Sequence, residues 1–383
     1  MKLEATTATM WRSSLFLSLA SFTSFAQNSN QHYSPLADNS TMKLLPTKRR
    51  EWFWVAVQLI VVTILFISVS IYCTSMPGHS YHGPFDKLSE DESALRDRLK
   101  DHVSTLATKI GQRNVKHYEA LSAAADFIQS KFRELGYEVS NQDYQVDAKP
   151  VKNIIAEQPA DSASVQLVIV GAHYDSLLGS PGANDNASGV AALLEIAGLL
   201  KNQHFVRKVR FVAFVNEEPP YFQTADMGSR RYASSLHQQN ENVAAMFSLE
   251  TIGCYSDAPN TQRYPFPFSL FYPDRGNFIG FVGNTSSRSM VRRSVKEFRE
   301  NAQFPSEGVA APGSLTGIGW SDQWSFWEEG YPGVMITDTA LFRYKYYHTL
   351  SDTPEKLDYD RMARVASGLA RVIVDAAGGT TSP

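Results

Sequence analysis

Residues 165–176 read VQLVIVGAHYDS, an apolar run that ends in a histidine and an aspartate. The run lacks the regular alternation of apolar and polar residues, which predicts a strand buried on both faces, as in a parallel sheet. His173 and Asp175 then emerge at the carboxyl end of that strand, where open α/β sheets place their ligands. This end of the strand is therefore a candidate site.

A second run, GANDNASG at residues 182–189, places Asp185 among small residues just before the apolar, helix-periodic stretch 190–200. The pattern is typical of a loop that leads into a helix. A metal ion held between Asp185 and His173 is one interpretation. The alternative for an isolated His-x-Asp is a satisfied histidine or a surface pair, so a metal site requires further ligands.

Further acidic and imidazole side chains follow other strand-like runs of the sequence. They are Glu217 and Glu218 after residues 209–215, Glu250 after residues 244–249, and His348 within YYHTLSDT at residues 346–353. A Glu-Glu pair on its own is commonly solvated. Nitrogen and oxygen ligands that gather at strand ends, with no cysteine among them, favour a borderline cation such as zinc.

Apolar periodicity predicts helices and strands that alternate along most of the chain. The expected helices are 88–110, 117–135, 190–200, 228–239, 286–301 and 356–377, and the expected strands are 137–146, 153–157, 165–170, 209–215, 243–249 and 333–337. Helices alternating with mainly buried strands predict a three-layer α/β/α sandwich around a mixed, mostly parallel sheet.

Residues 52–74 read WFWVAVQLIVVTILFISVSIYCT and contain no formal charge. A helix of this length crosses a hydrocarbon layer of ~30 Å. Lys48, Arg49 and Arg50 precede it, which predicts a cytoplasmic N-terminus and a periplasmic or extracellular remainder. We therefore expect a single-pass membrane protein.

The expected organisation is an N-terminal tail over 1–51, a transmembrane signal-anchor helix over 52–74, a linker over 75–85 and a catalytic domain over 86–383. Residues 14–26 resemble a weak signal-peptide core, which conflicts with the basic cluster that follows. Translation from Met42 would remove that conflict and give an ordinary signal-anchor.

The composition excludes some classes of function. A net charge of −3 and a pI near 6.3 give no basic footprint for nucleic acid. Two cysteines, Cys73 and Cys254, exclude a disulfide framework.

Other polar and aromatic residues have structural interpretations. Asp322 and Asp352 are interpreted as turn or supporting residues. The histidines interpreted as structural, without acidic neighbours, are His102, His117, His204 and His237. The aromatic residues that form either a pocket wall or core are Trp320, Trp324, Phe326, Trp327 and Tyr331.

Taken in order, GAHYDS, GANDNASG, NEE, SLETIG and YYHTLSDT resemble the co-catalytic zinc exopeptidases, which include bacterial leucyl aminopeptidases and glutamate carboxypeptidase II. The resemblance covers about residues 110–375. It implies an α/β/α sandwich that holds two zinc ions. It also implies the following roles: His173 and Glu250 as ligands of one ion, Asp185 as the bridge, Glu218 and His348 as ligands of the other ion, and Glu217 as the general base.

Elementary chemistry agrees with these roles. Two divalent ions ~3.5–4 Å apart require a carboxylate that bridges them. A carboxylate beside the reacting water transfers its proton, an effect of order 10²–10⁴ in rate. Asp175, two residues after His173, is placed to accept the other imidazole N–H, although an Asx turn is the alternative.

One position departs from the family pattern, because Glu250 stands where most members carry Asp. This leaves the choice between aminopeptidase and carboxypeptidase open. The leading hypothesis is a membrane-anchored di-zinc exopeptidase that removes N-terminal residues from peptides. The alternatives are a carboxypeptidase or dipeptidase, a glutaminyl cyclase-like enzyme that holds one zinc, and a metal-free receptor.

Overall fold

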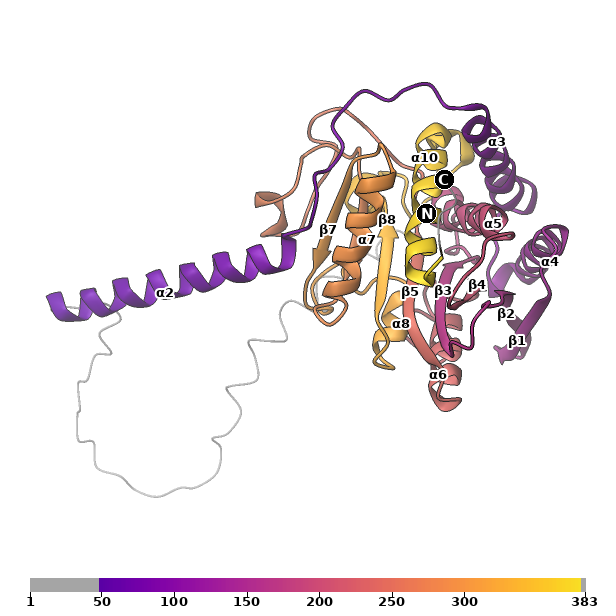
Figure 1. Ribbon diagram of the computed structural model, residues 1–383, viewed down its shortest axis with the longest axis horizontal. Coiled ribbons are helices and arrows are strands. Elements are labelled where there is room, and N and C mark those ends of the chain that lie inside the picture. Colours follow the sequence, from indigo (N-terminus) through magenta and orange to yellow (C-terminus); the bar gives the residue numbers. More distant parts are fainter. Residues whose placement is uncertain (1–47, 380–383) are drawn as a thin grey trace, which may run out of the picture. The chain divides into compact units, whose positions relative to one another are not determined.

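The computed structural model describes residues 48–379, and an eight-stranded mixed sheet lies at its centre (Figure 1). The order of strands is β1-β2-β4-β3-β5-β8-β6-β7. The strands are β1 Val139–Val146, β2 Lys149–Gln158, β3 Gln166–His173, β4 Lys208–Phe214, β5 Asn242–Glu250, β6 Ile279–Gly283, β7 Ser306–Ala310 and β8 Gly333–Thr337. The candidate start at Met42 and the signal-like stretch 14–26 lie outside the described residues.

The middle of the sheet is parallel. β3 pairs with β4 on one side and with β5 on the other, and β5 pairs with β8, all in parallel register. The antiparallel pairs are β1 with β2, β2 with β4, and β6 with β8. Because β4, β3, β5 and β8 run in one direction, their carboxyl ends meet at one edge of the sheet.

The main helices are α2 Arg49–Thr74, α3 Glu90–Ser104, α4 Tyr118–Glu134, α5 Gly189–Leu200, α6 Gly228–Gln238, α7 Arg288–Asn301, α8 Gln323–Trp327, α9 Ala340–Arg343 and α10 Tyr359–Ala377. Single turns of 3-10 type lie at Val115–His117, Phe268–Leu270 and Pro354–Lys356, and π-helical turns at Thr105–Ile110 and Ala183–Ser188. The predicted helix 88–110 is α-helical only as far as Ser104. The predicted helix 356–377 is α-helical only from Tyr359 onward.

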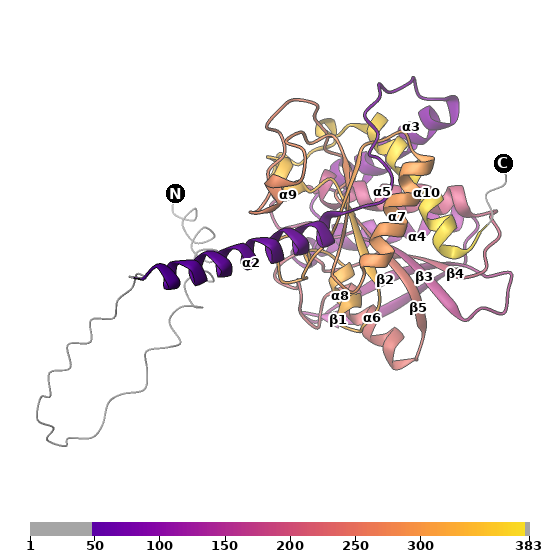
Figure 2. The ribbon, with the colours of Figure 1, turned by 60° about the vertical axis from the view of Figure 1, so that its left-hand side comes forward.

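Successive residues of β3 enter two different cores, because side chains alternate across a strand. Val168 and Val170 pack in the core that α3, α4, α5, α7 and α10 cover. Leu167 and Ile169 pack on the opposite face, beneath α6 and α8. In both views α10 lies beside α5 and α7 (Figures 1 and 2). The predicted three-layer α/β/α fold is therefore confirmed.

Two sequence-based expectations were wrong in detail. The pattern did not indicate β6 and β7, which extend the sheet beyond β8. Three of the histidines expected to lack acidic neighbours have one. His102 Nε2 lies 2.9 Å from Glu195 Oε1, His204 Nδ1 lies 2.8 Å from Asp161 Oδ2, and His237 Nδ1 lies 3.7 Å from Glu329 Oε2. The partner of His102 is 93 residues away in the sequence, so no local pattern reveals it.

The chain divides into two compact units, residues 1–62 and 63–383, and the whole sheet belongs to the second. Among the described residues, Arg49–Thr74 is the one helix long and apolar enough to cross a membrane. Cys73 and Cys254 are both free thiols, as expected for a chain without a disulfide framework.

Candidate functional site

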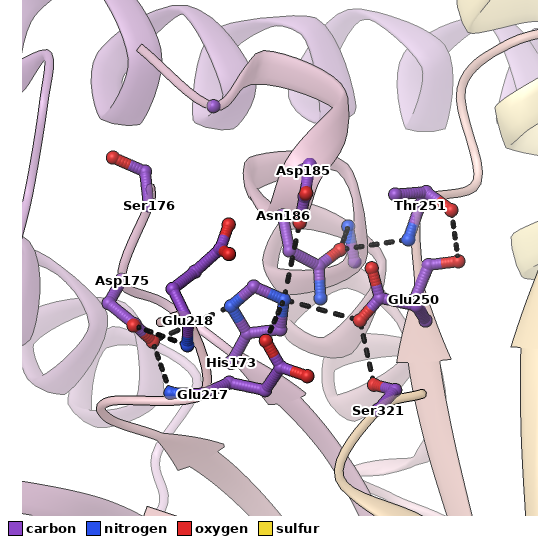
Figure 3. A network of polar contacts seen from close by, with 12 residues as sticks. His173, Asp175, Ser176, Asp185, Asn186, Glu217, Glu218, Glu250, Thr251 and Ser321 are labelled. Carbon is purple, nitrogen blue, oxygen red and sulfur yellow. Dashed lines mark hydrogen bonds and ion pairs between the residues drawn. The ribbon is translucent and has the colours of Figure 1, made fainter. Parts of the chain in front are cut away.

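Three neighbouring parallel strands deliver the acidic and imidazole side chains to one edge of the sheet (Figure 3). His173 is the last residue of β3, and Glu250 is the last residue of β5. Glu217 and Glu218 follow the end of β4 at Phe214. The sequence-predicted residues therefore meet where parallel strands place ligands.

Asp185 belongs to two groups of candidate ligands at once. On one side, His173 Nε2 lies 3.3 Å from Asp185 Oδ1 and 3.2 Å from Glu250 Oε2. On the other side, His348 Nε2 lies 3.0 Å from Asp185 Oδ2 and 3.3 Å from Glu218 Oε2. In each group the ligand atoms lie within 4.8 Å of one another. The two histidines thus face different oxygens of a single carboxylate.

Glu217 is buried beside these groups without belonging to either. Its Oε2 lies 3.8 Å from His173 Nε2. Burial raises the pKa of Glu217 well above its usual range, and the carboxylates of Glu250 and Glu218 act in the same direction against the lowering effect of His173. Its carboxylate therefore lies beside the group that contains His173.

The donor set fits a divalent cation. Among the described residues, both ring nitrogens of His173 and Nε2 of His348 are buried and make no hydrogen bond. Buried polar atoms normally have a hydrogen-bond partner or a bound ion, so these nitrogens are candidate ligands of a metal ion. Burial and the charge of Asp185 raise the pKa of Glu218 to about 7, although His348 lowers it. A concentration of buried negative charge beside unpartnered imidazole nitrogens is the environment in which Zn²⁺ binds.

Asp175 holds the acidic pair in place. Its Oδ1 and Oδ2 accept hydrogen bonds from the backbone N–H groups of Glu217 and Glu218, both at 3.1 Å. Its Oδ1 also lies 3.5 Å from His173 Nδ1. One carboxylate therefore contacts the backbone of both glutamates and the imidazole ring that opposes them.

Asp352 fixes the loop that carries Asp185. Its carboxylate accepts the backbone N–H of Asn184 at 2.8 Å and of Asp185 at 3.1 Å, and Tyr344 Oη donates to it at 2.9 Å. The predicted supporting role of Asp352 is confirmed by these contacts. Because Asp352 lies four positions after His348, the same carboxylate connects the segments that carry both residues.

Gly182 begins the Asp185 loop in a left-handed conformation, with φ at +62°. A side chain there would approach the backbone oxygen of Asp185 to 2.3 Å, which no Cβ tolerates. Three non-glycine residues, Asn216, Thr251 and His348, also have positive φ, between 45° and 61°. Such conformations cost free energy and are typical of sites that the surrounding structure holds in place.

Arg113 is a residue of this site that the sequence did not reveal. Its side chain is fully buried. The guanidinium donates to the carbonyl oxygens of Tyr174 at 2.6 Å, Pro181 at 2.6 Å and Gly182 at 2.8 Å. It therefore joins the end of β3 to the start of the Asp185 loop.

Replacing Arg113 with alanine should lower the free energy of unfolding by roughly 3–5 kcal/mol, because three buried carbonyl groups lose their donor. Chemical denaturation of the full chain, followed by circular dichroism, measures this loss. The control is Arg133→Ala, an exposed arginine on α4 that donates to Gln129; we expect it to stay within about 0.5 kcal/mol of wild type. Equal stability of the two variants would contradict the structural role of Arg113.

The predicted aromatic cluster divides between cavity and core. Trp320 lines a cavity that opens beside Glu250. Phe326 is buried in the core beneath α6, and Tyr331 packs against it. Trp327 donates its ring N–H to the carbonyl oxygen of Gly333. The interpretation as a pocket wall therefore holds for Trp320 and not for Phe326.

Comparison with known proteins agrees with this architecture. Residues 153–373 match the model of peptidase family M28. The chain is 36% identical over 322 residues to the uncharacterised protein YfbL of Escherichia coli K12, a match that covers 81% of this chain and 98% of YfbL. It is also 36% identical over 104 residues to aminopeptidase YwaD of Bacillus subtilis, covering 27% of this chain and 22% of YwaD.

Solved structures share the fold at low sequence identity. The zinc aminopeptidase BSAP from Bacillus subtilis superimposes with a TM-score of 0.61 at 17% identity, covering 75% of this chain and 95% of BSAP. A glutaminyl cyclase from Fimbriiglobus ruber superimposes with a TM-score of 0.56 at 21% identity, covering 78% of this chain and 99% of the cyclase. The extent of the family match and the full-length match to YfbL establish the relationship. The chain therefore belongs to peptidase family M28 and is a zinc metallopeptidase.

Proposed function

We propose that this protein is a di-zinc aminopeptidase that removes N-terminal residues from peptides. His173, Asp185 and Glu250 would hold one ion, and Asp185, Glu218 and His348 would hold the other. The observation that carries this proposal is that the two oxygens of Asp185 face different histidines, at 3.3 and 3.0 Å. Two adjacent cations require such a shared carboxylate.

Zinc bound in this position supplies Lewis-acid polarisation of the scissile carbonyl and lowers the pKa of water. Glu217 takes a proton from the attacking water and returns it to the leaving amine. Asp175 Oδ1 lies 3.5 Å from His173 Nδ1, on the side of the ring away from the other carboxylates, where it would orient the imidazole for metal binding. Its hydrogen bonds to the backbone of Glu217 and Glu218 keep the base and the ligand in fixed relative positions.

The charge of the neighbouring cavity favours a peptide N-terminus over a C-terminus. The cavity beside Glu250 is lined by apolar and aromatic side chains together with Glu250 and Glu307, and no lysine or arginine belongs to its lining. A carboxypeptidase needs a cationic group to bind the terminal carboxylate of its substrate. An amino terminus is instead complementary to carboxylates. Glu250, though longer than the usual Asp, reaches His173 at 3.2 Å, which supports its role as a ligand.

We further propose that the helix Arg49–Thr74 anchors the enzyme in a membrane. Lys48, Arg49 and Arg50 at its start favour a cytoplasmic N-terminus, and the catalytic domain then lies on the periplasmic or extracellular side.

The experiment is a substrate panel for the full-length protein in detergent, with zinc content measured in the same preparation. We expect hydrolysis of aminoacyl p-nitroanilides, no release from N-blocked dipeptides, and loss of activity with a zinc chelator that zinc restores. Release from N-blocked dipeptides would instead identify a carboxypeptidase. Conversion of glutaminyl substrates to pyroglutamyl products without hydrolysis would identify a cyclase, and zinc-free protein without activity would contradict the enzyme proposal.

A further inference from the structure

The cavity beside Glu250 follows one row of paired residues across the sheet. Glu250 on β5 pairs with Thr337 on β8, Thr337 pairs with Gly280 on β6, and Gly280 pairs with Glu307 on β7. All four residues line the cavity. Neighbouring strands lie about 4.8 Å apart, so this row of three intervals separates the Cα atoms of Glu250 and Glu307 by about 14 Å. The row begins at the candidate metal site and ends at a second carboxylate.

Gly280 leaves the middle of this row open. It has no side chain between Thr337 and Glu307, and the backbone oxygen of Thr337 lies 3.2 Å from the place of a Cβ. The walls above the row are largely aromatic and include Tyr264, Tyr272 and Trp320. The cavity is therefore an apolar passage from Glu250 to Glu307.

The Glu307 side chain is partly buried, with 23% of its surface exposed. Its nearest cation is Arg299, with Nη2 3.7 Å from Oε2. Arg299 gives its hydrogen bonds to other acceptors, namely Ser306, Pro77 and Gly78. Among the described residues no group donates a hydrogen bond to the Glu307 carboxylate.

Burial raises the pKa of Glu307 to about 6, although Arg299 lowers it. Tyr264 and Tyr272 line the same cavity, and their hydroxyls donate to the backbone oxygens of Pro273 and Gly308. Burial raises the pKa of both hydroxyls, and the charge of Glu307 acts in the same direction. Above pH 6 the passage therefore ends in an ionised carboxylate that no protein donor satisfies.

We propose that Glu307 is a specificity-determining residue that selects peptides with lysine or arginine at the N-terminus. The inference rests on the proposed function, since it assigns this cavity to the N-terminal side chain of an aminopeptidase substrate. A long aliphatic stem passes over Gly280 and packs against the aromatic walls, while the cationic end reaches Glu307. Short apolar side chains leave the far end of the cavity unfilled and give the carboxylate no hydrogen-bond donor.

The energetics favour this assignment over a purely apolar substrate. A partly buried carboxylate that accepts no hydrogen bond from the protein is complementary to an ammonium or guanidinium group. An extended apolar side chain fills the same passage but gives Glu307 no donor. The change in this preference when Glu307 is replaced therefore measures the contribution of its carboxylate.

The test compares lysine with norleucine p-nitroanilide, and arginine with citrulline p-nitroanilide, at pH 8 with the zinc-loaded full-length enzyme. Norleucine has the aliphatic stem of lysine without the ammonium group, and citrulline matches arginine in length without its charge. We expect kcat/KM to favour the cationic member by at least about tenfold, the range of a hydrogen bond to a charged group. In Glu307→Gln the preference should fall about 10- to 100-fold, because kcat/KM for lysine falls much more than kcat/KM for norleucine.

The matched control is Glu300→Gln on α7, which removes an exposed carboxylate that pairs with Lys296 and lies outside the cavity lining. We expect it to keep the preference for lysine. Wild-type enzyme that hydrolyses norleucine as well as lysine would overturn the inference and leave the proposed aminopeptidase intact. Equal loss on both substrates in Glu307→Gln would also overturn it, since that result indicates a structural role. An enzyme that hydrolyses no aminoacyl substrate would contradict the proposed function itself.

Discussion

Replacing Glu217 with glutamine should reduce kcat by roughly 10²–10⁴-fold, the range that proton transfer by a positioned carboxylate contributes. The amide keeps the shape of the side chain but cannot accept a proton from water. Because Glu217 belongs to neither group of candidate ligands, zinc content should remain at the wild-type value. Steady-state kinetics and metal analysis on one preparation measure both quantities.

A suitable control for that variant is Glu328→Gln, which changes an exposed glutamate at the end of α8. It should retain wild-type kcat and zinc content. Normal turnover in Glu217→Gln would exclude Glu217 as the base. Loss of zinc along with activity would instead assign Glu217 to the metal ligands.

Asp185→Asn should affect both candidate metal positions, because both groups share this carboxylate. The amide offers one neutral oxygen where the carboxylate offers two charged ones, so we expect zinc content to fall from two ions per chain to one or fewer. Loss of metal-ion catalysis, worth several kcal/mol, should lower kcat/KM by about 10³-fold. Elemental analysis after gel filtration and hydrolysis of leucine p-nitroanilide measure the two effects.

His348→Ala changes only one of the two candidate metal positions, and it therefore tests whether Asp185 is shared between them. It should remove one ion and leave the group of His173, Asp185 and Glu250 occupied. The control is Asp161→Asn, an exposed carboxylate beside His204 that lies outside both groups. Two ions retained by Asp185→Asn would contradict its proposed bridging role.

The sequence predicted the candidate site well because its signals are local. His173, Glu217, Glu218 and Glu250 each follow an apolar run directly, and parallel strands place such ends at one edge. Their roles as ligands and base stay predictions that the variants above test. The burial of the central strands on both faces follows from the same logic, since uninterrupted apolar runs belong in the middle of a covered sheet.

Other features could not be predicted, since they depend on contacts between distant residues. Arg113 reaches carbonyl groups 61 to 69 residues away, and Asp352 accepts from backbone groups 167 and 168 residues away. The strands β6 and β7 have only five residues each and contain glycine, which weakens the sequence signal of a strand. Their burial arises from packing against α7 and β8.

The place of β8 in the sheet has a consequence for biosynthesis. β8 lies late in the chain but sits between β5 and β6, so it joins the pair β6–β7 to the rest of the sheet. A nascent polypeptide that stops before Gly333 leaves β5 with an unpaired edge and has not yet received His348. Incomplete translation products therefore lack peptidase activity and expose a surface for quality-control proteases, so hydrolysis begins only after nearly all of the chain has been synthesised.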